Sequence, residues 1–333
     1  MPRIPHPARR ALVVSAAAAT AAVAWAFTGA AAMAQSTSDR AVRVVLPNAT
    51  GSGVDAITRG IQAALAKALG QAVVVENQPG AGGVLGLQTL ARSAPDGLTL
   101  SVVSNNVVIF PSVIKQLPFD MPGDFTPIAV VGNTPIVLVI NPKVPAKDHK
   151  EFAAWLKAQN GKANYASGGN GTILHLAAEM YVDEVGARAN HIPYKGVGPM
   201  VTDLIGGQVE FATAALPSVQ QHIKGGALRA IDLGSAQRTP AAPDIPTMAE
   251  QGLPSYLVEA WFAVIGPKGM TAADVKRIHD AVSAAFNDAG VKELMAKQGN
   301  VIRISSPAEA QAFFKSELQK YAALVKKAGI EAQ

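Results

Sequence analysis

Between residues 42 and 59 the chain reads V-R-V-V-L-P-N-A-T-G-S-G-V-D-A-I-T-R. The aliphatic residues at 42–46 predict a buried strand, and Pro47 ends it. Apolar residues three and four positions apart then predict a helix that stops at Gly70: Val54, Ile57, Ile61, Leu65 and Leu69. A strand, a turn of small residues and a helix N-terminus together direct free backbone N–H groups and the positive helix end to one place. Such a place suits an anion.

The turn at residues 48–53 differs in sequence from a nucleotide-binding loop. Its G-S-G-V-D segment supplies neither the lysine of a P-loop nor a G-x-G-x-x-G pattern. A carboxylate is the more natural ligand, because two or three N–H donors satisfy it without a metal or a counter-charge. The alternative is an ordinary strand-to-helix connection whose residues are small because the turn is tight.

The same arrangement recurs at residues 165–179, which read Y-A-S-G-G-N-G-T-I-L-H-L-A-A-E. A strand ends at Ala166, small polar residues form the turn 167–171, and Thr172 caps a helix that runs to residue 185. Backbone donors therefore converge at a second helix start. Two such turns in successive α/β units are what a ligand held between two domains requires.

Residues 1–34 have the composition of an export signal. Three arginines precede an apolar segment, and the A-M-A that follows is a small-x-small cleavage site. We expect cleavage after Ala34 and a periplasmic mature protein. Export uses either the general secretory route or, given the paired Arg9 and Arg10, the twin-arginine route.

Length and charge narrow the class of protein further. Removing 34 of the 333 residues leaves a chain long enough for two domains with separate cores. Three of the 29 basic residues go with the signal, so 26 remain against 24 acidic ones, a balance that argues against a nucleic-acid partner. The sequence contains no cysteine, which excludes disulfides, thiolate metal sites and cysteine nucleophiles.

From residue 42 short β-branched runs alternate with helical stretches, as in an α/β domain with a largely parallel sheet. Strands are predicted at residues 42–46, 72–76, 98–103, 128–131 and 136–141, and helices at 54–69 and 84–92. Loops after the carboxyl ends of parallel strands line the ligand crevice. This rule brings Ser104, Asn105 and Asn106 to the same edge as the turn at 50–53.

N-P at 141–142 and V-P at 144–145 interrupt the pattern and indicate a domain crossing. A second α/β unit follows, with strands predicted at 163–166, 189–193 and 208–213 and helices at 148–158, 172–185, 199–205 and 217–224. A strand at 228–233 leads back to the first domain, which gains a strand at 260–265 and helices at 272–289, 291–298 and 307–327. The predicted domains are residues 35–142 with about 233–333, and residues 143–232.

Several segments belong to a recurrent pattern: P-x-x-x-G-x-x-x-D at 47–55, V-V-V-E-N-Q-P-G-A-G-G at 73–83, A-P-D-G-L-T-L at 94–100, L-P-F-D at 117–120, S-G-G-N-G-T at 167–172, H-I-P-Y-K-G at 191–196 and D-L-I-G-G-Q-V-E at 203–210. Together they resemble the substrate-binding proteins of tripartite tricarboxylate transporters, the Bug receptors. The similarity runs from about residue 42 to residue 266 and continues weakly to the end.

The resemblance implies a two-lobed periplasmic receptor with a type II-like binding-protein fold. Each lobe is expected to be a mixed, largely parallel sheet flanked by helices, with the ligand cleft between the lobes. It also implies a small carboxylate ligand and its delivery to a membrane permease. We expect no cofactor, no metal and a monomer. The expected ligand-binding residues are Asn48, Thr50, Gly51, Ser52, Gly53, Val54, Ser104, Asn105, Ser167, Gly168, Gly169, Asn170, Gly171, Thr172, Tyr194, Thr213 and Ala214. For Tyr194 a packing role is the alternative.

One departure from the family bears on the ligand. Family members read F-D-N-L-P-S where this chain has T-A-A-L-P-S at 213–218, so a polar or acidic position near the cleft is missing. No acidic side chain is then expected to pair with a ligand ammonium, and Lys195 is the nearest cation. Because an unpaired desolvated ammonium is costly, we expect a mono- or dicarboxylate without an amine.

The sequence also bears on two other functions. An enzyme is disfavoured, because the sequence has no G-x-S-x-G elbow, no H-E-x-x-H motif and no histidines paired at metal-ligand spacing. Ser167 with His175 is better explained by a packing or capping histidine on the following helix. A periplasmic sensor subunit stays open, since sensing and transport use the same closed form.

Overall fold

The computed structural model describes residues 40–327, 329, 330 and 332. All elements named below lie in the unit Ala41–Gln333. The expected export signal at residues 1–34 lies outside the described residues. In the part of the chain that is described, no helix is both long and apolar enough to cross a membrane.

The first half of the sheet is parallel at its outer edge. Strand β1 (Val42–Leu46) lies between β2 (Val73–Asn77) and β3 (Thr99–Ser104) and pairs in parallel with both. The connecting helices are α2 (Gly53–Leu69) and α3 (Val84–Ala91), and the 3-10 turn η2 (Ala81–Gly83) precedes α3. Ser52 caps α2, and Gly70 ends it with a φ of 66°, so both predicted ends of this helix are confirmed.

The second half repeats this plan. Strand β5 (Asn164–Ser167) lies between β6 (Asn190–Pro193) and β7 (Phe211–Ala215) and pairs in parallel with both. Its helices are α5 (His149–Ala158), α6 (Ile173–Glu184), α7 (Val197–Gly206) and α8 (Leu216–Lys224). Thr172 caps α6 as predicted, because its hydroxyl accepts the N–H of His175.

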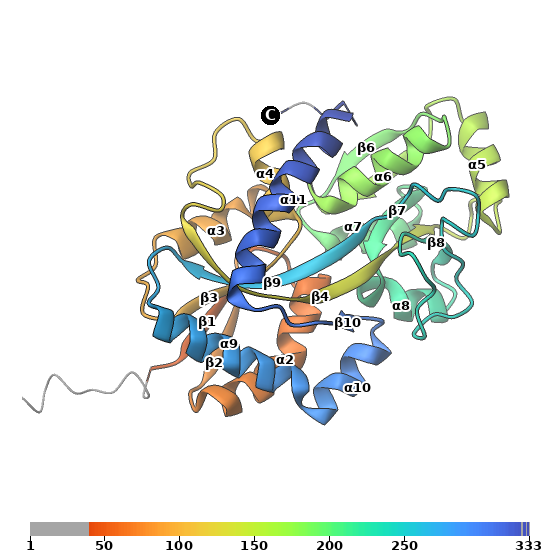
Figure 1. Ribbon diagram of the computed structural model, residues 1–333. Coiled ribbons are helices and arrows are strands. Elements are labelled where there is room, and N and C mark those ends of the chain that lie inside the picture. The colour runs from red at the N-terminus through yellow and green to blue at the C-terminus, as the bar shows by residue number, and fades with distance from the viewer. Residues whose placement is uncertain (1–39, 328, 331, 333) are drawn as a thin grey trace, which may run out of the picture. The chain divides into compact units, whose positions relative to one another are not determined.

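Two long strands join the halves (Figure 1). β4 (Phe125–Ile140) pairs antiparallel with β9 (Glu259–Pro267) as far as Pro135, and from Ile136 onward with β7 and β8 (Arg229–Leu233). The prediction of two separate strands at 128–131 and 136–141 is therefore wrong. Gly132 and Pro135 resemble a turn in the sequence, but the strand continues along β9 with a register shift between Val130 and Gly132 and regular pairing from Asn133 to Pro135.

The C-terminal elements cover the first half and the crossing strands. Helices α9 (Ala272–Asn287) and α10 (Ala289–Lys297) pack on α2, and β10 (Val301–Ile302) adds to β4. Helix α11 (Pro307–Lys327), which begins and ends where the sequence predicts, packs on β4 and on α4 (Asn106–Val113). Helix α4 was not predicted, because V-V-I-F-P-S carries Pro111 inside an apolar run.

Two hydrophobic cores hold these layers together. One lies beneath β1, α2, α9 and α10 and includes Ile57, Phe262 and Phe286. The other extends from α3 and α4 through β4 into the second half, where Tyr165, Tyr181 and Phe211 are fully buried. This second core reaches both halves, so β4 is anchored on each side of the position where it changes partners.

Candidate ligand-binding site

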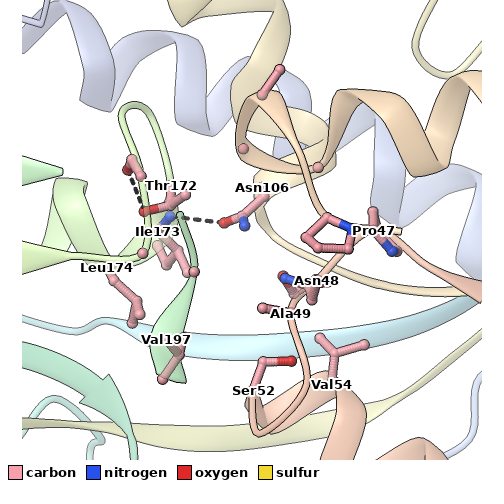
Figure 2. A pocket seen from close by; sticks show the side chains of 18 of the residues that line it. Pro47, Asn48, Ala49, Ser52, Val54, Asn106, Thr172, Ile173, Leu174 and Val197 are labelled. Carbon is pink, nitrogen blue, oxygen red and sulfur yellow. Dashed lines mark hydrogen bonds between the residues drawn. The ribbon is translucent and has the colours of Figure 1, made fainter. Parts of the chain in front are cut away.

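A cavity of about 850 Å³ opens at the carboxyl ends of the parallel strands. Its wall is formed mainly by the segments that follow β1, β2, β3, β5 and β6, and Ala215 of β7 and Ala260 and Phe262 of β9 also line it. Figure 2 shows residues of the two strand-to-helix turns facing each other across this space. The volume is that of a small-molecule pocket, at the edge where α/β proteins bind ligands.

At the first turn some of the backbone N–H groups already donate to side chains of the protein. The N–H of Gly51 donates to Oδ2 of Asp55 at 3.0 Å, and the N–H of Asp55 donates to Oγ of Ser52 at 3.2 Å. Asp55, whose side chain is buried, also accepts from Arg59 at 2.8 Å. Gly53 and Val54 line the cavity, and their N–H groups have no acceptor within the helix because they belong to its first turn.

At the second turn most N–H groups are likewise occupied. Gly171 donates to Nδ1 of His175 at 3.1 Å, and the N–H of Ile173 donates to Oδ1 of Asn106 at 2.8 Å. Leu174 is the next residue of α6, and its N–H has no acceptor within the helix. It lines the cavity together with Gly168. The free donors that face a ligand are therefore fewer than the two turns suggest, and they lie at the starts of α2 and α6.

Each of the two turns is closely approached by a loop from the other half. A Cβ on Gly196 would lie 2.6 Å from the Cβ of Ala49, and one on Gly82 would lie 3.7 Å from the carbonyl oxygen of Asn170. The first distance is shorter than any real contact between side chains. Glycine at position 196 therefore lets the loop after β6 meet the turn after β1.

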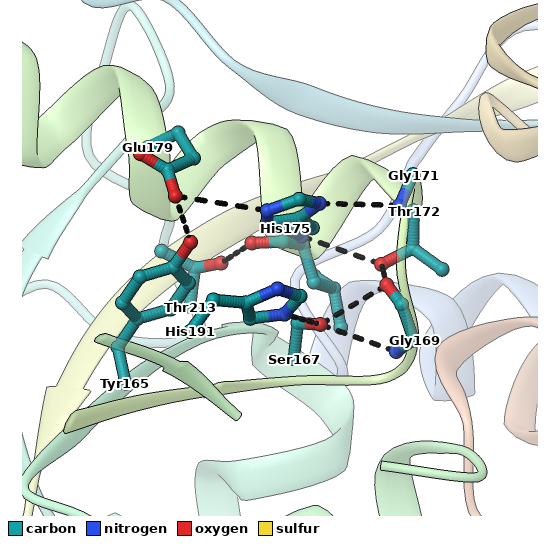
Figure 3. Close-up of polar contacts among 10 residues, drawn as sticks. Tyr165, Ser167, Gly169, Gly171, Thr172, His175, Glu179, His191 and Thr213 are labelled. Atoms are coloured by element: carbon teal, nitrogen blue, oxygen red, sulfur yellow. Dashed lines mark hydrogen bonds and ion pairs between the residues drawn. The ribbon is translucent and has the colours of Figure 1, made fainter. Parts of the chain in front are cut away.

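Behind the second turn lies a group of stacked aromatic and imidazole rings (Figure 3). The rings of His175 and His191 stack with their centroids 3.8 Å apart, and Tyr165 stacks on His191 at 5.0 Å. Ser167, at the end of β5, contacts Nε2 of His191 through Oγ at 2.6 Å and accepts the N–H of Gly169 at 3.2 Å. The imidazole pair thus supports the turn from the side opposite the cavity.

Burial is the main influence on the protonation of His191 in this group. Burial, and then the neighbouring His175, lower the pKa of His191 to about 4. Burial alone would raise the pKa of Glu179, but hydrogen bonds from His175 and Tyr165 hold it below its usual value. Nδ1 of His175 accepts a backbone N–H and is therefore unprotonated, so the proton of the neutral ring is on Nε2, which lies 3.7 Å from Glu179.

The cavity wall favours an anion. Among the described residues that line it none is Asp or Glu, and Lys195 is a cation in the wall. Tyr194 also lines it, and its hydroxyl donates to Asp203 at 2.9 Å. Burial, followed by Asp203, raises the pKa of Tyr194 to about 12, so the phenol stays neutral. Asp203 and Glu210 lie outside the wall. Asp203 accepts from the Tyr194 hydroxyl and Glu210 accepts the N–H of Asn164.

The structure brings most of the expected site residues to the cavity. Those that line it are Asn48, Ser52, Gly53, Val54, Ser104, Gly168, Gly169, Asn170, Thr172 and Tyr194. Those that do not are Thr50, Gly51, Asn105, Ser167, Gly171, Thr213 and Ala214. Contact of either set with a ligand stays a prediction.

Two of the side chains outside the wall are hydrogen-bonded to other parts of the protein. Asn105 is fully buried, where its Oδ1 accepts the N–H of Trp261 and its Nδ2 donates to the carbonyl oxygen of Glu259 and to the Tyr321 hydroxyl. Thr213 is also buried and donates to the carbonyl oxygen of Leu174 at 2.6 Å. These side chains connect elements of the protein to one another.

Several parts of the wall were missing from the expected set of ligand-binding residues. Among them are the loop after β2, which contributes residues 79–84, and Asn106, the first residue of α4, which the sequence placed at this edge without assigning it to the ligand. The rule that places loops at the carboxyl edge applies to β2 as well as to β3. Applied to every strand, it finds the P-G-A-G-G segment from sequence alone.

Comparison with known proteins agrees with this geometry. The family model described as tripartite tricarboxylate transporter family receptor matches residues 57–330. The chain belongs to this receptor family. Protein BugT of Bordetella pertussis is 36% identical to it over 292 residues, which cover 87% of this chain and 90% of BugT.

Two solved structures of similar proteins are complexes with organic acids. An R. palustris protein with adipate has a TM-score of 0.86 and 26% identity, with 90% of this chain and 100% of that chain covered. MatC from Rhodopseudomonas palustris with bound malate has a TM-score of 0.79 and 30% identity, with 86% and 99% covered. The fold of the receptor family and its two-lobed binding-protein architecture are thus shared by this chain.

Proposed function

We propose that the protein is a periplasmic receptor that captures a small carboxylate without an amine and delivers it to a membrane permease of the tripartite tricarboxylate type. The observation that carries the proposal is the chemistry of the cavity wall. It combines backbone N–H groups at the starts of α2 and α6 with Lys195, and none of the described residues in it is acidic. Adipate and malate in similar proteins are acids of this class.

The ligand class also follows from what a zwitterion would need. An ammonium group inside the cavity requires a carboxylate or several acceptor oxygens, because an unpaired charge out of water is strongly unfavourable. A carboxylate requires N–H donors and gains from the positive ends of two helices. The wall is better suited to the second kind of group.

The protein itself can be used to identify the ligand. We expect protein purified without added organic acids to retain one, detectable by mass spectrometry after denaturation. Recovery of a mono- or dicarboxylic acid at near-stoichiometric amount supports the proposal. Recovery of an amino acid instead contradicts the ligand class.

We also propose export with cleavage after Ala34. The basic start, apolar segment and A-M-A site of residues 1–34 motivate it, and membership of a receptor family of this kind agrees with it. Intact-mass measurement of protein from the periplasm should give a chain that begins at Gln35. Full-length protein in the membrane fraction would overturn this part.

The two lobes are proposed as residues 35–142 with about 233–333, and residues 143–232. The pairing of β4 with β9 before Ile136, and with β7 and β8 after it, favours a first boundary somewhat earlier, inside β4. A second crossing runs beside it, where the N–H of Gly234 donates to the carbonyl oxygen of Ile136 at 2.7 Å. If the lobes close around a ligand, the two connecting segments would bend at neighbouring positions, near Ile136 and Gly234.

A further inference from the structure

Asn106 has one end of its side chain bonded and the other end free. It is the first residue of α4, is 8% exposed and lines the cavity. Its Oδ1 accepts the N–H of Ile173 at 2.8 Å, which joins α4 to the start of α6. No hydrogen-bond partner of its Nδ2 is found among the described residues, and Figure 2 shows a dashed line only at its oxygen.

The orientation of this amide is fixed by its partner. A backbone N–H can only donate, so the group that faces Ile173 must be the oxygen. The NH₂ group is therefore turned away from α6 and presents its two N–H donors on the cavity side.

The neighbouring residue shows what a purely structural asparagine looks like here. Asn105 is fully buried and both ends of its amide are bonded, to Trp261, Glu259 and Tyr321. The Nδ2 of Asn106, by contrast, has no acceptor among the described residues and is not enclosed by protein atoms, because the side chain opens onto the cavity. An acceptor for this nitrogen therefore has to come from whatever occupies the cavity, a ligand or water.

We propose that Asn106 is a ligand-contacting, specificity-determining residue that donates through Nδ2 to a carboxylate oxygen of the ligand while its Oδ1 joins the two halves of the wall. This inference rests on the proposed function and names a residue outside the two glycine-rich turns. Because the side chain offers only donors on the cavity side, it selects oxygen acceptors and gives an ammonium group no partner.

The sharpest test is Asn106→Asp, which replaces the side-chain NH₂ group by an oxygen and keeps the size and shape of the side chain. The aspartate retains an oxygen for the N–H of Ile173 but replaces the free NH₂ by a second carboxylate oxygen. We expect calorimetric affinity for the amine-free acids of a panel (succinate, malate, adipate) to fall roughly ten- to hundredfold, as for a lost charge-assisted hydrogen bond. Asn106→Ala, which loses the donor without adding a charge, should bind more weakly than the wild type and more tightly than Asn106→Asp.

Asn287→Asp is the matched control, because it makes the same change of charge at an exposed position on α9. Its affinity should equal that of the wild type. If Asn106 had only a structural role, its variants would melt at a lower temperature but keep the wild-type ratio of affinities for succinate and aspartate. Both the melting temperature and this affinity ratio are therefore measured for each variant.

The outcomes separate the two proposals. If the wild type binds succinate, malate or adipate and both Asn106 variants bind it equally well, the role of Asn106 is overturned and the receptor function stands. Should Asn106→Asp fail to fold, wild-type affinity in Asn106→Ala has the same meaning. If the wild type binds no amine-free acid but does bind amino acids, the proposed function fails and the inference fails with it.

Discussion

At the scale of single residues, the site depends on positions where a side chain would intrude between the two halves. Gly196 is the clearest, with a φ of 121° and a would-be Cβ 2.6 Å from that of Ala49. Its presence in the P-Y-K-G motif thus has a physical reason: only glycine allows this backbone conformation and this approach. The motif alone does not show which neighbour demands it, because Ala49 is far away in the sequence.

Gly196→Ala is therefore expected to weaken ligand binding by about tenfold or more, since about 1.4 kcal/mol of strain suffices for that factor. The added methyl group keeps the loop after β6 from reaching Ala49. Gly226→Ala serves as the control, because Gly226 has a φ of 75° and open space around its would-be Cβ. Titration calorimetry of both variants with the same acid checks this. Equal affinity in the two would show that the contact at Ala49 does not matter for binding.

At the scale of elements, the sequence predicts those helix and strand boundaries that depend only on neighbouring residues. Helix α11 was predicted with both of its ends, because Ser306, Pro307 and Glu309 form a helix start that needs no tertiary partner. The continuity of β4 was missed, since Gly132 and Pro135 read as a break and only pairing with β9 carries the strand through them.

The same distinction applies to the site. The two glycine-rich turns follow from strand, turn and helix signals in the sequence, so their place in the wall could be predicted. Which of their N–H groups are already hydrogen-bonded could not be predicted. Asp55 accepts the N–H of Gly51, and Asn106 accepts the N–H of Ile173. The second bond joins segments whose contact no local sequence pattern reveals.

The β5–α6 element carries a pH dependence that can be measured. The titratable side chains in contact with one another here are His175 and Glu179 on α6, Tyr165 on β5, and His191 on the neighbouring β6. The pKa of His191 in the folded protein, about 4, lies below the ordinary value of 6.5. The unfolded chain therefore binds more protons between these two values, and the free energy of unfolding decreases as the pH falls through this window.

The slope from one such histidine is at most about 1.4 kcal/mol per pH unit. We expect the melting temperature to fall from pH 6.5 toward pH 4, and to fall less steeply in His191→Gln, which cannot take up the proton. Parallel melting curves for the wild type and His191→Gln across this range would refute the role of the imidazole pair.

At the scale of the whole unit Ala41–Gln333, the chain crosses between its halves along β4 and again ahead of β9. The cavity lies where the strand-to-helix turns of both halves meet, so a ligand there contacts both. A ligand that binds only the folded state adds about 2.7 kcal/mol of stability when its concentration is 100 times its dissociation constant. Binding is thus visible in the melting temperature as well as in calorimetry.

The central claim is that this cavity accepts a carboxylate and rejects an ammonium group. Calorimetry with matched pairs of acids tests it most directly: malate against aspartate, 2-hydroxyglutarate against glutamate, and adipate against 2-aminoadipate. We predict that at least one amine-free acid binds and that its amino counterpart binds at least tenfold more weakly, because no acidic side chain among the described residues of the wall can pair with the ammonium. Tighter binding of the amino acid in the pairs that bind at all would contradict the account.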